Sequence, residues 1–219
     1  MMASLPNTHN LENTRDLIKK LENTPILPQF ALASLDIANL YTSIPVKETR
    51  EIIANTLRKN LTDPPAEQEL LNWYDTITKQ NYFSNKDTIL IQQDGLAMGI
   101  PTSGIIAEFF LQNLEHAQLT HLSNKHKIVR YFRYIDNILI ICDSNHTDID
   151  NKQNDFNTLN SNMKSTAETE TNNKLNFLDV TIHRTPPPTG KFPYIENLPL
   201  PTPLSHIPQT TQPSTNTQP

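Results

Sequence analysis

Two stretches of the sequence place carboxylates where they could bind cations. The first, SLDIANLYTSIP at residues 34–45, closes an apolar run with Asp36. The second, YFRYIDNILII at residues 131–141, puts Asp136 and Asn137 in a tight turn between two apolar runs. A carboxylate at the end of a buried strand is costly unless it is paired or bound to a cation. Each acid also has a plain structural explanation, because Asp can simply end or cap an element and Asp-Asn is ordinary hairpin chemistry.

A third stretch, QDGLAMGIPTS at residues 93–103, carries two glycines and a proline directly before an apolar helical pattern. Such a loop lets the backbone approach a ligand closely and aims helix N–H groups at an anion. By itself this signal is weak, since the spacing matches neither a P-loop nor a dinucleotide-binding fingerprint.

Together, the three stretches predict nucleotidyl transfer. Two acids on hairpin-linked strands can hold two divalent cations about 3.5–4 Å apart. Such a pair of cations activates a primer 3′-hydroxyl and holds a triphosphate while its pyrophosphate leaves. The glycine loop would then lie under the templating base pair.

The hydrophobic spacing predicts elements that could bring these stretches together. Helices are predicted at 11–22 with Asn10 or Asn13 as cap, 46–60, 66–80, 102–122 and about 148–163. Strands are predicted at 30–36, 127–134, 138–142, 165–170 and 174–182, with a further hairpin within 81–93. Helices interleaved with hairpin-connected strands favour an α+β fold, with a mostly antiparallel sheet and the helices packed on one face.

Composition excludes several classes of site. The chain has 219 residues, a net charge of -5 and one cysteine, Cys142, which excludes an internal disulfide framework and a cysteine-based zinc site. No apolar run reaches the roughly 18–20 residues of a membrane span and no signal peptide is visible, so we expect an intracellular protein without a membrane partner. The acidic balance argues weakly against a free-standing nucleic-acid binder. The five-residue spacing of three histidines suits no single helical face, so we expect them at the surface: His116, His121 and His126.

Four motifs, in their order and spacing, resemble the reverse transcriptase palm of Penelope-like retroelements. They are SLDIANLYTSIPV, QQDGLAMGIPTS, RYFRYIDNILII and NNKLNFLDVTIHR, and the resemblance covers roughly residues 30–184. It implies an RNA-directed DNA polymerase that uses an RNA template, a DNA primer and deoxynucleoside triphosphates. It also implies two Mg²⁺ ions as cofactors and a nuclear location.

The resemblance assigns roles by position. Asp36 and Asp136 match the family's catalytic, metal-binding acids, and the backbone carbonyl of Ile37 would complete a metal shell. Tyr41 matches the aromatic gate that acts against a ribose 2′-hydroxyl. The loop under the nascent base pair corresponds to Gly95, Met98, Gly99 and Pro101.

The third motif departs from the family pattern. The family reads Tyr-x-Asp-Asp, whereas residues 134–137 read YIDN, so Asn137 replaces a carboxylate at the catalytic turn. Ile100 and Ser165 also stand where the family has a small residue and a Phe. We therefore expect weakened metal binding, and we expect little activity because complete fingers and a thumb are missing as well. The alternative is a non-catalytic remnant, or a co-opted binding protein that uses the palm as a scaffold.

Three segments are expected along the chain. Residues 1–29 would be a helical remnant of incomplete fingers, 30–184 the palm and 185–219 a disordered Pro/Thr-rich tail, with no thumb. Ten of the 17 prolines fall in that tail, and proline blocks both helix and sheet. The tail is either a true linker or a frameshifted reading. Permitted codons for residues 194–199, read two bases later, give YRKPT, which resembles the family's continuation.

Overall fold

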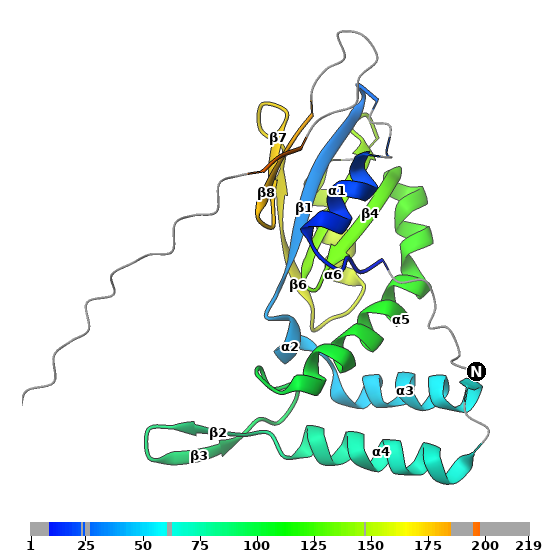
Figure 1. The fold of residues 1–219 in the computed structure, drawn as a ribbon, viewed down its shortest axis with the longest axis vertical. Coiled ribbons are helices and arrows are strands. Elements are labelled where there is room, and N and C mark those ends of the chain that lie inside the picture. Colours follow the sequence, from blue (N-terminus) through cyan, green and yellow to red (C-terminus); the bar gives the residue numbers. More distant parts are fainter. Residues whose placement is uncertain are drawn as a thin grey trace, which may run out of the picture.

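The centre of the molecule is a four-stranded antiparallel sheet with the strand order β4-β5-β1-β6. The computed structural model describes residues 9–22, 24, 27–60, 63–146, 148–184 and 195–197. The four strands are β1 (Phe30–Ala38), β4 (Ile128–Tyr134), β5 (Asn137–Asp143) and β6 (Lys164–Thr169). Strands β1 and β5 lie in the middle of this sheet, and the expected α+β fold with an antiparallel sheet is confirmed (Figure 1).

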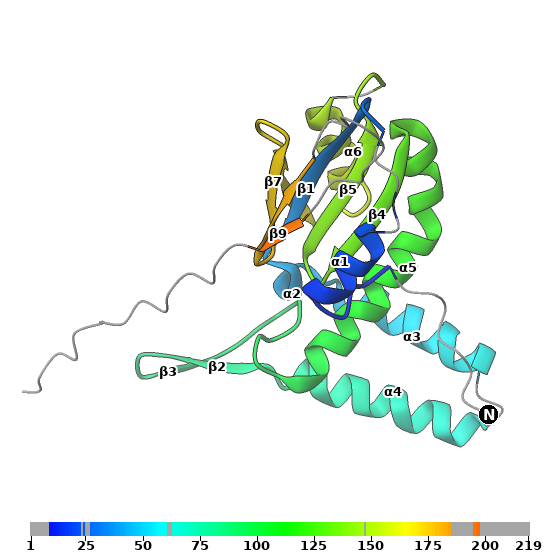
Figure 2. The same cartoon turned by 45° about the horizontal axis from the view of Figure 1, so that its top comes forward.

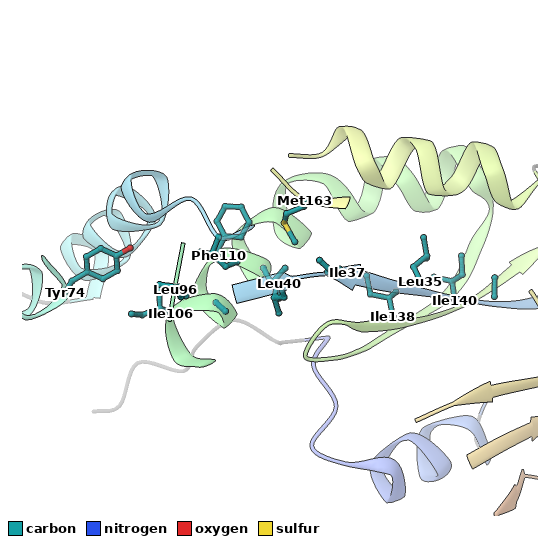
Figure 3. Close-up of a cluster of buried hydrophobic side chains, with 14 residues drawn as sticks. Leu35, Ile37, Leu40, Tyr74, Leu96, Ile106, Phe110, Ile138, Ile140 and Met163 are labelled. Carbon is teal, nitrogen blue, oxygen red and sulfur yellow. The ribbon is translucent and has the colours of Figure 1, made fainter. Parts of the chain in front are cut away.

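Helices cover one face of the sheet. This layer consists of α5 (Pro101–His126) and α6 (Ile149–Thr158), and the short α2 (Leu40–Ser43), α3 (Val46–Asn60) and α4 (Pro64–Lys79) extend it past the end of β1. Figure 3 shows Leu35 and Ile37 of β1, Ile138 of β5 and Phe110 of α5 as members of one buried cluster. Each such side chain, when fully buried, contributes roughly 1.5–3 kcal/mol relative to exposure.

The opposite face is also covered, which corrects the expectation of helices on one face only. Helix α1 (Thr14–Glu22) and a small sheet of β7 (Lys174–Phe177), β8 (Val180–His183) and β9 (Ile195–Asn197) lie there (Figure 2). The cause lies in β5, where Leu139 and Ile141 point to this second face and are both 0% exposed. A central strand that is apolar on both sides needs cover on both sides.

One expected strand assignment was wrong, and so was part of the expected disordered tail. Residues 174–182 form a hairpin instead of one strand, because the chain turns between Phe177 and Val180 with Leu178 at φ 55°. In the tail, residues 195–197 pair with β8, so the expectation of disorder is wrong at these three residues. The rest of the tail lies outside the described residues.

Helix α5 is four residues longer at its C-terminal end than the spacing predicted, and this buries a histidine that was expected at the surface. His126 is 1% exposed, and its Nε2 lies 2.7 Å from Asp155 Oδ2 on α6. His116 and His121 are exposed, as expected. The pair of His126 and Asp155 therefore joins the two helices that cover the first face. Within the described part of the chain, no helix is long and apolar enough to cross a membrane.

A two-stranded hairpin extends away from this body. It consists of β2 (Tyr82–Asn85) and β3 (Thr88–Ile91) and projects beyond the end of α4 (Figures 1 and 2). Its residues are exposed on both faces, including Phe83 at 50% and Ile89 at 76%. The hairpin predicted within 81–93 is confirmed, but it contributes nothing to the buried core.

Candidate active site

The end of β1 and the turn between β4 and β5 lie side by side. Asp36 is opposite Asn137 in the register of β1 and β5. The backbone N–H of Ile37 donates a hydrogen bond to the carbonyl of Asp136 at 3.0 Å. The structure thus brings together all four residues predicted for catalysis and metal binding, with Asp136 in the turn itself.

The turn is a two-residue loop with strained geometry. Tyr134 and Asn137 are the last paired residues of the hairpin, so Ile135 and Asp136 form the loop. Ile135 has φ 55°, whereas Asp136 keeps a negative φ, which is the pattern of a type II′ turn. Glycine usually takes that first position, and a β-branched residue there is a true outlier. Such strain persists only where the surrounding structure enforces it.

Negative charge accumulates beside this turn. Burial, together with the nearby carboxylates of Asp136 and Glu168, raises the pKa of Asp36 above its ordinary value of 3.8. Asn137 partly offsets the charge, because its Nδ2 donates a hydrogen bond to Asp136 Oδ1 at 2.9 Å. A divalent cation would relieve the same repulsion, and carboxylate oxygens are its preferred ligands.

The donor set fits such a cation, although with few charged ligands. Among the described residues, no group of three or more His, Cys, Asp or Glu side chains is arranged to hold a metal ion. Asp36 and Asp136 would therefore have to share it with neutral oxygens, such as the backbone carbonyl of Ile37. Fewer charged ligands make a weaker site.

A polar cleft of about 210 Å³ opens in front of Asp36, and sequence reasoning missed half of its polar lining. Thr166 and Glu168 reach it from β6, since they pair with Asp36 and Ser34 of β1. Asn176 of β7 lines the same cleft. The two-residue alternation along β6 was the only available signal for Thr166 and Glu168, and it does not reveal which strand is the neighbour.

The glycine loop packs against α2. Gly95 has φ 79°, and a Cβ at this position would lie 2.4 Å from the carbonyl oxygen of Thr42, so only glycine fits. The next residue, Leu96, donates its N–H to the carbonyl of Tyr41 at 2.7 Å. The two motifs that the sequence predicts to act together are therefore joined through their backbones.

Tyr41 shares a second cleft, of about 290 Å³, with Ile135 of the turn and Gly104 of α5. A Cβ on Gly104 would lie 4.0 Å from the Tyr41 hydroxyl, in ordinary van der Waals contact, so the two residues face each other across this cleft. Met98 is 77% exposed, Gly99 has φ 90° with open space around it, and neither lines the two clefts. Pro101 is the first residue of α5, where its missing N–H costs nothing.

Solved structures of telomerase share this fold. Apo telomerase from Candida tropicalis matches with a TM-score of 0.62 and 13% sequence identity, over 80% of this chain and 35% of the telomerase chain. Telomerase from Candida albicans, in complex with a fragment of telomeric RNA, matches with a TM-score of 0.65 and 12% identity, over 80% and 34% of the two chains. The chain thus spans about a third of the telomerase chains that it matches.

Sequence comparison points to the same fold. A search of curated protein sequences finds no match. The family model described as "Reverse transcriptase (RNA-dependent DNA polymerase)" matches residues 3–183. This range contains the sheet, the turn at Asp136 and every element that covers the sheet except β9. The chain therefore belongs to the reverse transcriptase family and forms its palm-like region.

Proposed function

We propose that this chain is the palm of an RNA-directed DNA polymerase from a Penelope-like retroelement, acting in the nucleus on an RNA template and a DNA primer. One observation carries the proposal: Asp36 lies opposite Asn137, and the N–H of Ile37 is bonded to the carbonyl of Asp136. Two acids that are 100 residues apart in the sequence thus lie close enough to repel each other, beside a polar cleft that Asp36 and Asn137 line. The four motifs in their order support the Penelope-like origin.

In this function the carboxylates of Asp36 and Asp136 and the carbonyl of Ile37 would hold Mg²⁺. The cation supplies positive charge that activates the primer hydroxyl and neutralises the triphosphate. Tyr41 would contact the nucleotide in the cleft that it shares with Gly104. Its ring would clash with a ribose 2′-hydroxyl and so would select deoxynucleotides. Gly95 fixes the loop against α2, so that the loop backbone can support the base pair.

Asn137 makes this copy a poor polymerase. It supplies no negative charge, and its amide occupies a lone pair on Asp136 Oδ1 that a cation would otherwise use. This contact favours a second candidate, a non-catalytic remnant or co-opted binding protein that retains the palm as a scaffold. The two candidates differ in whether the cleft binds divalent cations at all.

Cation binding tests the proposal. Mn²⁺, a spectroscopic substitute for Mg²⁺, is titrated into the 219-residue chain and its free fraction is followed by electron paramagnetic resonance. We expect Asp36→Asn to weaken binding at least tenfold. The matched control Asp87→Asn removes an exposed acid in the turn of the distant β2–β3 hairpin and should leave the affinity unchanged. Equal affinity in all three proteins would refute the site.

Primer extension on an RNA template with Mg²⁺ is the second arm of this test. We expect little synthesis from the wild-type chain, and any synthesis should disappear in Asp36→Asn. Robust synthesis would contradict the proposed loss of activity, while its dependence on Asp36 would support the polymerase assignment. A chain that binds no Mn²⁺ and extends no primer would instead be the scaffold of the second candidate.

A further inference from the structure

Arg133 is a charged residue in the middle of the buried core. It lies on β4 opposite Ile138, and its side chain is 0% exposed on the face that α5 covers. A buried guanidinium is very costly unless each of its donors is paired. Arg133 therefore needs a structural or functional reason to be there.

All five N–H donors of Arg133 are used. Nη1 and Nη2 donate to the two carboxylate oxygens of Glu108 at 2.9 and 3.0 Å. Nε and Nη2 donate to those of Glu115 at 2.5 and 3.2 Å. Both acids lie on α5, and Glu115 also accepts the hydroxyl of Tyr131 at 2.9 Å. Burial alone would lower the pKa of Arg133, but these hydrogen bonds outweigh it and raise the pKa.

The remaining hydrogen bond reaches the catalytic turn. Nη1 of Arg133 also donates to the carbonyl oxygen of Ile135 at 3.2 Å. The backbone N–H of Ile135 donates to Asn10 Oδ1 at 3.2 Å, so both the N–H and the carbonyl of Ile135 are hydrogen-bonded. Ile135 is the strained residue at φ 55°, and its carbonyl belongs to the peptide that leads into Asp136.

We propose that Arg133 is a positioning residue, which fastens the Ile135–Asp136 turn to α5 and so keeps the carboxylate of Asp136 beside Asp36. Two bidentate acids on a long helix fix the guanidinium plane, and the fixed plane presents one N–H to the turn. The role in cation binding rests on the proposed function, whereas the role in holding the turn does not.

The test compares Arg133→Lys with a matched control. Lysine keeps the charge, but its single ammonium cannot serve two carboxylates and a carbonyl in fixed directions. The control is Arg184→Lys, because Arg184 also makes a bidentate pair, with Glu170, and donates to a backbone carbonyl, that of Pro28. That pair lies away from the catalytic turn.

Two readouts are taken from each protein. Amide hydrogen exchange of Ile135, followed by NMR without metal, should accelerate at least tenfold in Arg133→Lys and stay unchanged in Arg184→Lys. Mn²⁺ affinity should fall at least tenfold in Arg133→Lys only. If Arg133→Lys does not fold, Glu115→Gln keeps the size and one acceptor and should show the same two changes to a smaller extent.

The outcomes separate the two proposals. Unchanged exchange at Ile135 together with unchanged Mn²⁺ affinity in a folded Arg133 variant would make this residue merely structural and overturn the inference. If the wild-type chain binds no Mn²⁺, the proposed function fails, yet the exchange at Ile135 still decides whether Arg133 holds the turn.

Discussion

Asn137 partly offsets the negative charge at the turn between β4 and β5. Its amide sits 2.9 Å from Asp136 Oδ1, and Asp36 lies opposite it on β1. An aspartate at this position would place a carboxylate in contact with Asp136 and opposite Asp36 on β1, so that three carboxylates would lie together. Like charges this close raise each other's pKa and destabilise the folded state, unless a cation binds between them.

We therefore predict that Asn137→Asp lowers stability without Mg²⁺ and increases the stabilisation that Mg²⁺ provides. Without divalent cations, the variant should melt at a lower temperature than the wild type, because the repulsion is unrelieved. Added Mg²⁺ at a saturating concentration should raise the melting temperature of the variant more than that of the wild type, since each tenfold gain in affinity adds about 1.4 kcal/mol at the same Mg²⁺ concentration. Thermal unfolding with Asn137→Ala as control tests this. Equal Mg²⁺ shifts in the wild type and Asn137→Asp would contradict it.

For single residues, the sequence identified those whose role is visible in the few residues around them. An acid closing an apolar run indicated Asp36, and a polar pair between two strands indicated Asp136 and Asn137. Glu168 and Arg133 were not identified, because the role of each depends on which strand or helix lies beside it. Strand neighbours are set by long-range pairing, which no local pattern encodes.

An ion pair fastens α4 to α3. Nε and Nη2 of Arg50 donate to the two carboxylate oxygens of Asp75 at 2.8 and 3.2 Å. Beside them, the hydroxyl of Tyr74 donates to the carbonyl of Val46 at 2.7 Å. The hydrogen bond from Arg50 lowers the pKa of Asp75 below its ordinary value of 3.8. A carboxyl whose pKa is depressed by folding stabilises the protein above its unfolded pKa, and this stabilisation is lost as the pH falls through the folded pKa.

We predict that Asp75→Asn costs about 1 kcal/mol of unfolding free energy at neutral pH. The difference from the wild type should shrink as the pH falls below 3.8, where Asp75 takes up a proton. Urea unfolding over a pH series measures it. Glu67→Gln is the matched control, since Glu67 joins the same two helices through Arg58, which is 57% exposed, and should cost less. A pH-independent loss in Asp75→Asn would exclude the ion pair as its cause.

Elements with a strong period were predictable, and those decided by single backbone angles were not. The helix over 46–60 agrees with α3 at both ends, and Asn13 caps α1 by accepting the N–H of Asp16 at 3.0 Å. The break between β7 and β8 was missed because Leu178, with φ 55°, is not a residue type that signals a turn. Its neighbour Asp179 accepts a hydrogen bond from the hydroxyl of Thr14, so contact with the N-terminal segment supports the turn.

In the molecule as a whole, the N-terminal segment belongs to the core of the palm. Leu11, Leu17 and Leu21 are at most 4% exposed and pack with Leu32 of β1 and Leu139 of β5. The segment also lies along the edge of β4, where the N–H of Leu11 donates to the carbonyl of Arg133 at 2.6 Å. A domain that begins at residue 30, as the motifs suggested, would leave one face of its sheet partly uncovered.

The two ends of the chain should therefore differ in how far they can be shortened. In the described residues, both buried clusters lie between Leu11 and Ile182, so a chain of residues 1–184 loses only the pairing of β9 with β8. We expect it to unfold cooperatively, with a melting temperature within a few degrees of the full chain.

A chain of residues 30–219 instead loses three buried leucines. Each is worth about 2–5 kcal/mol, so the three together match the roughly 5–15 kcal/mol that stabilises a typical domain. We expect this chain to lack a cooperative transition in calorimetry and to bind a dye that reports exposed apolar surface. The same test applied to Leu17→Ala in the full chain should show an intermediate loss. A stable, cooperatively folded 30–219 chain would show that the palm folds without the N-terminal segment, and that α1 is an addition to a complete core.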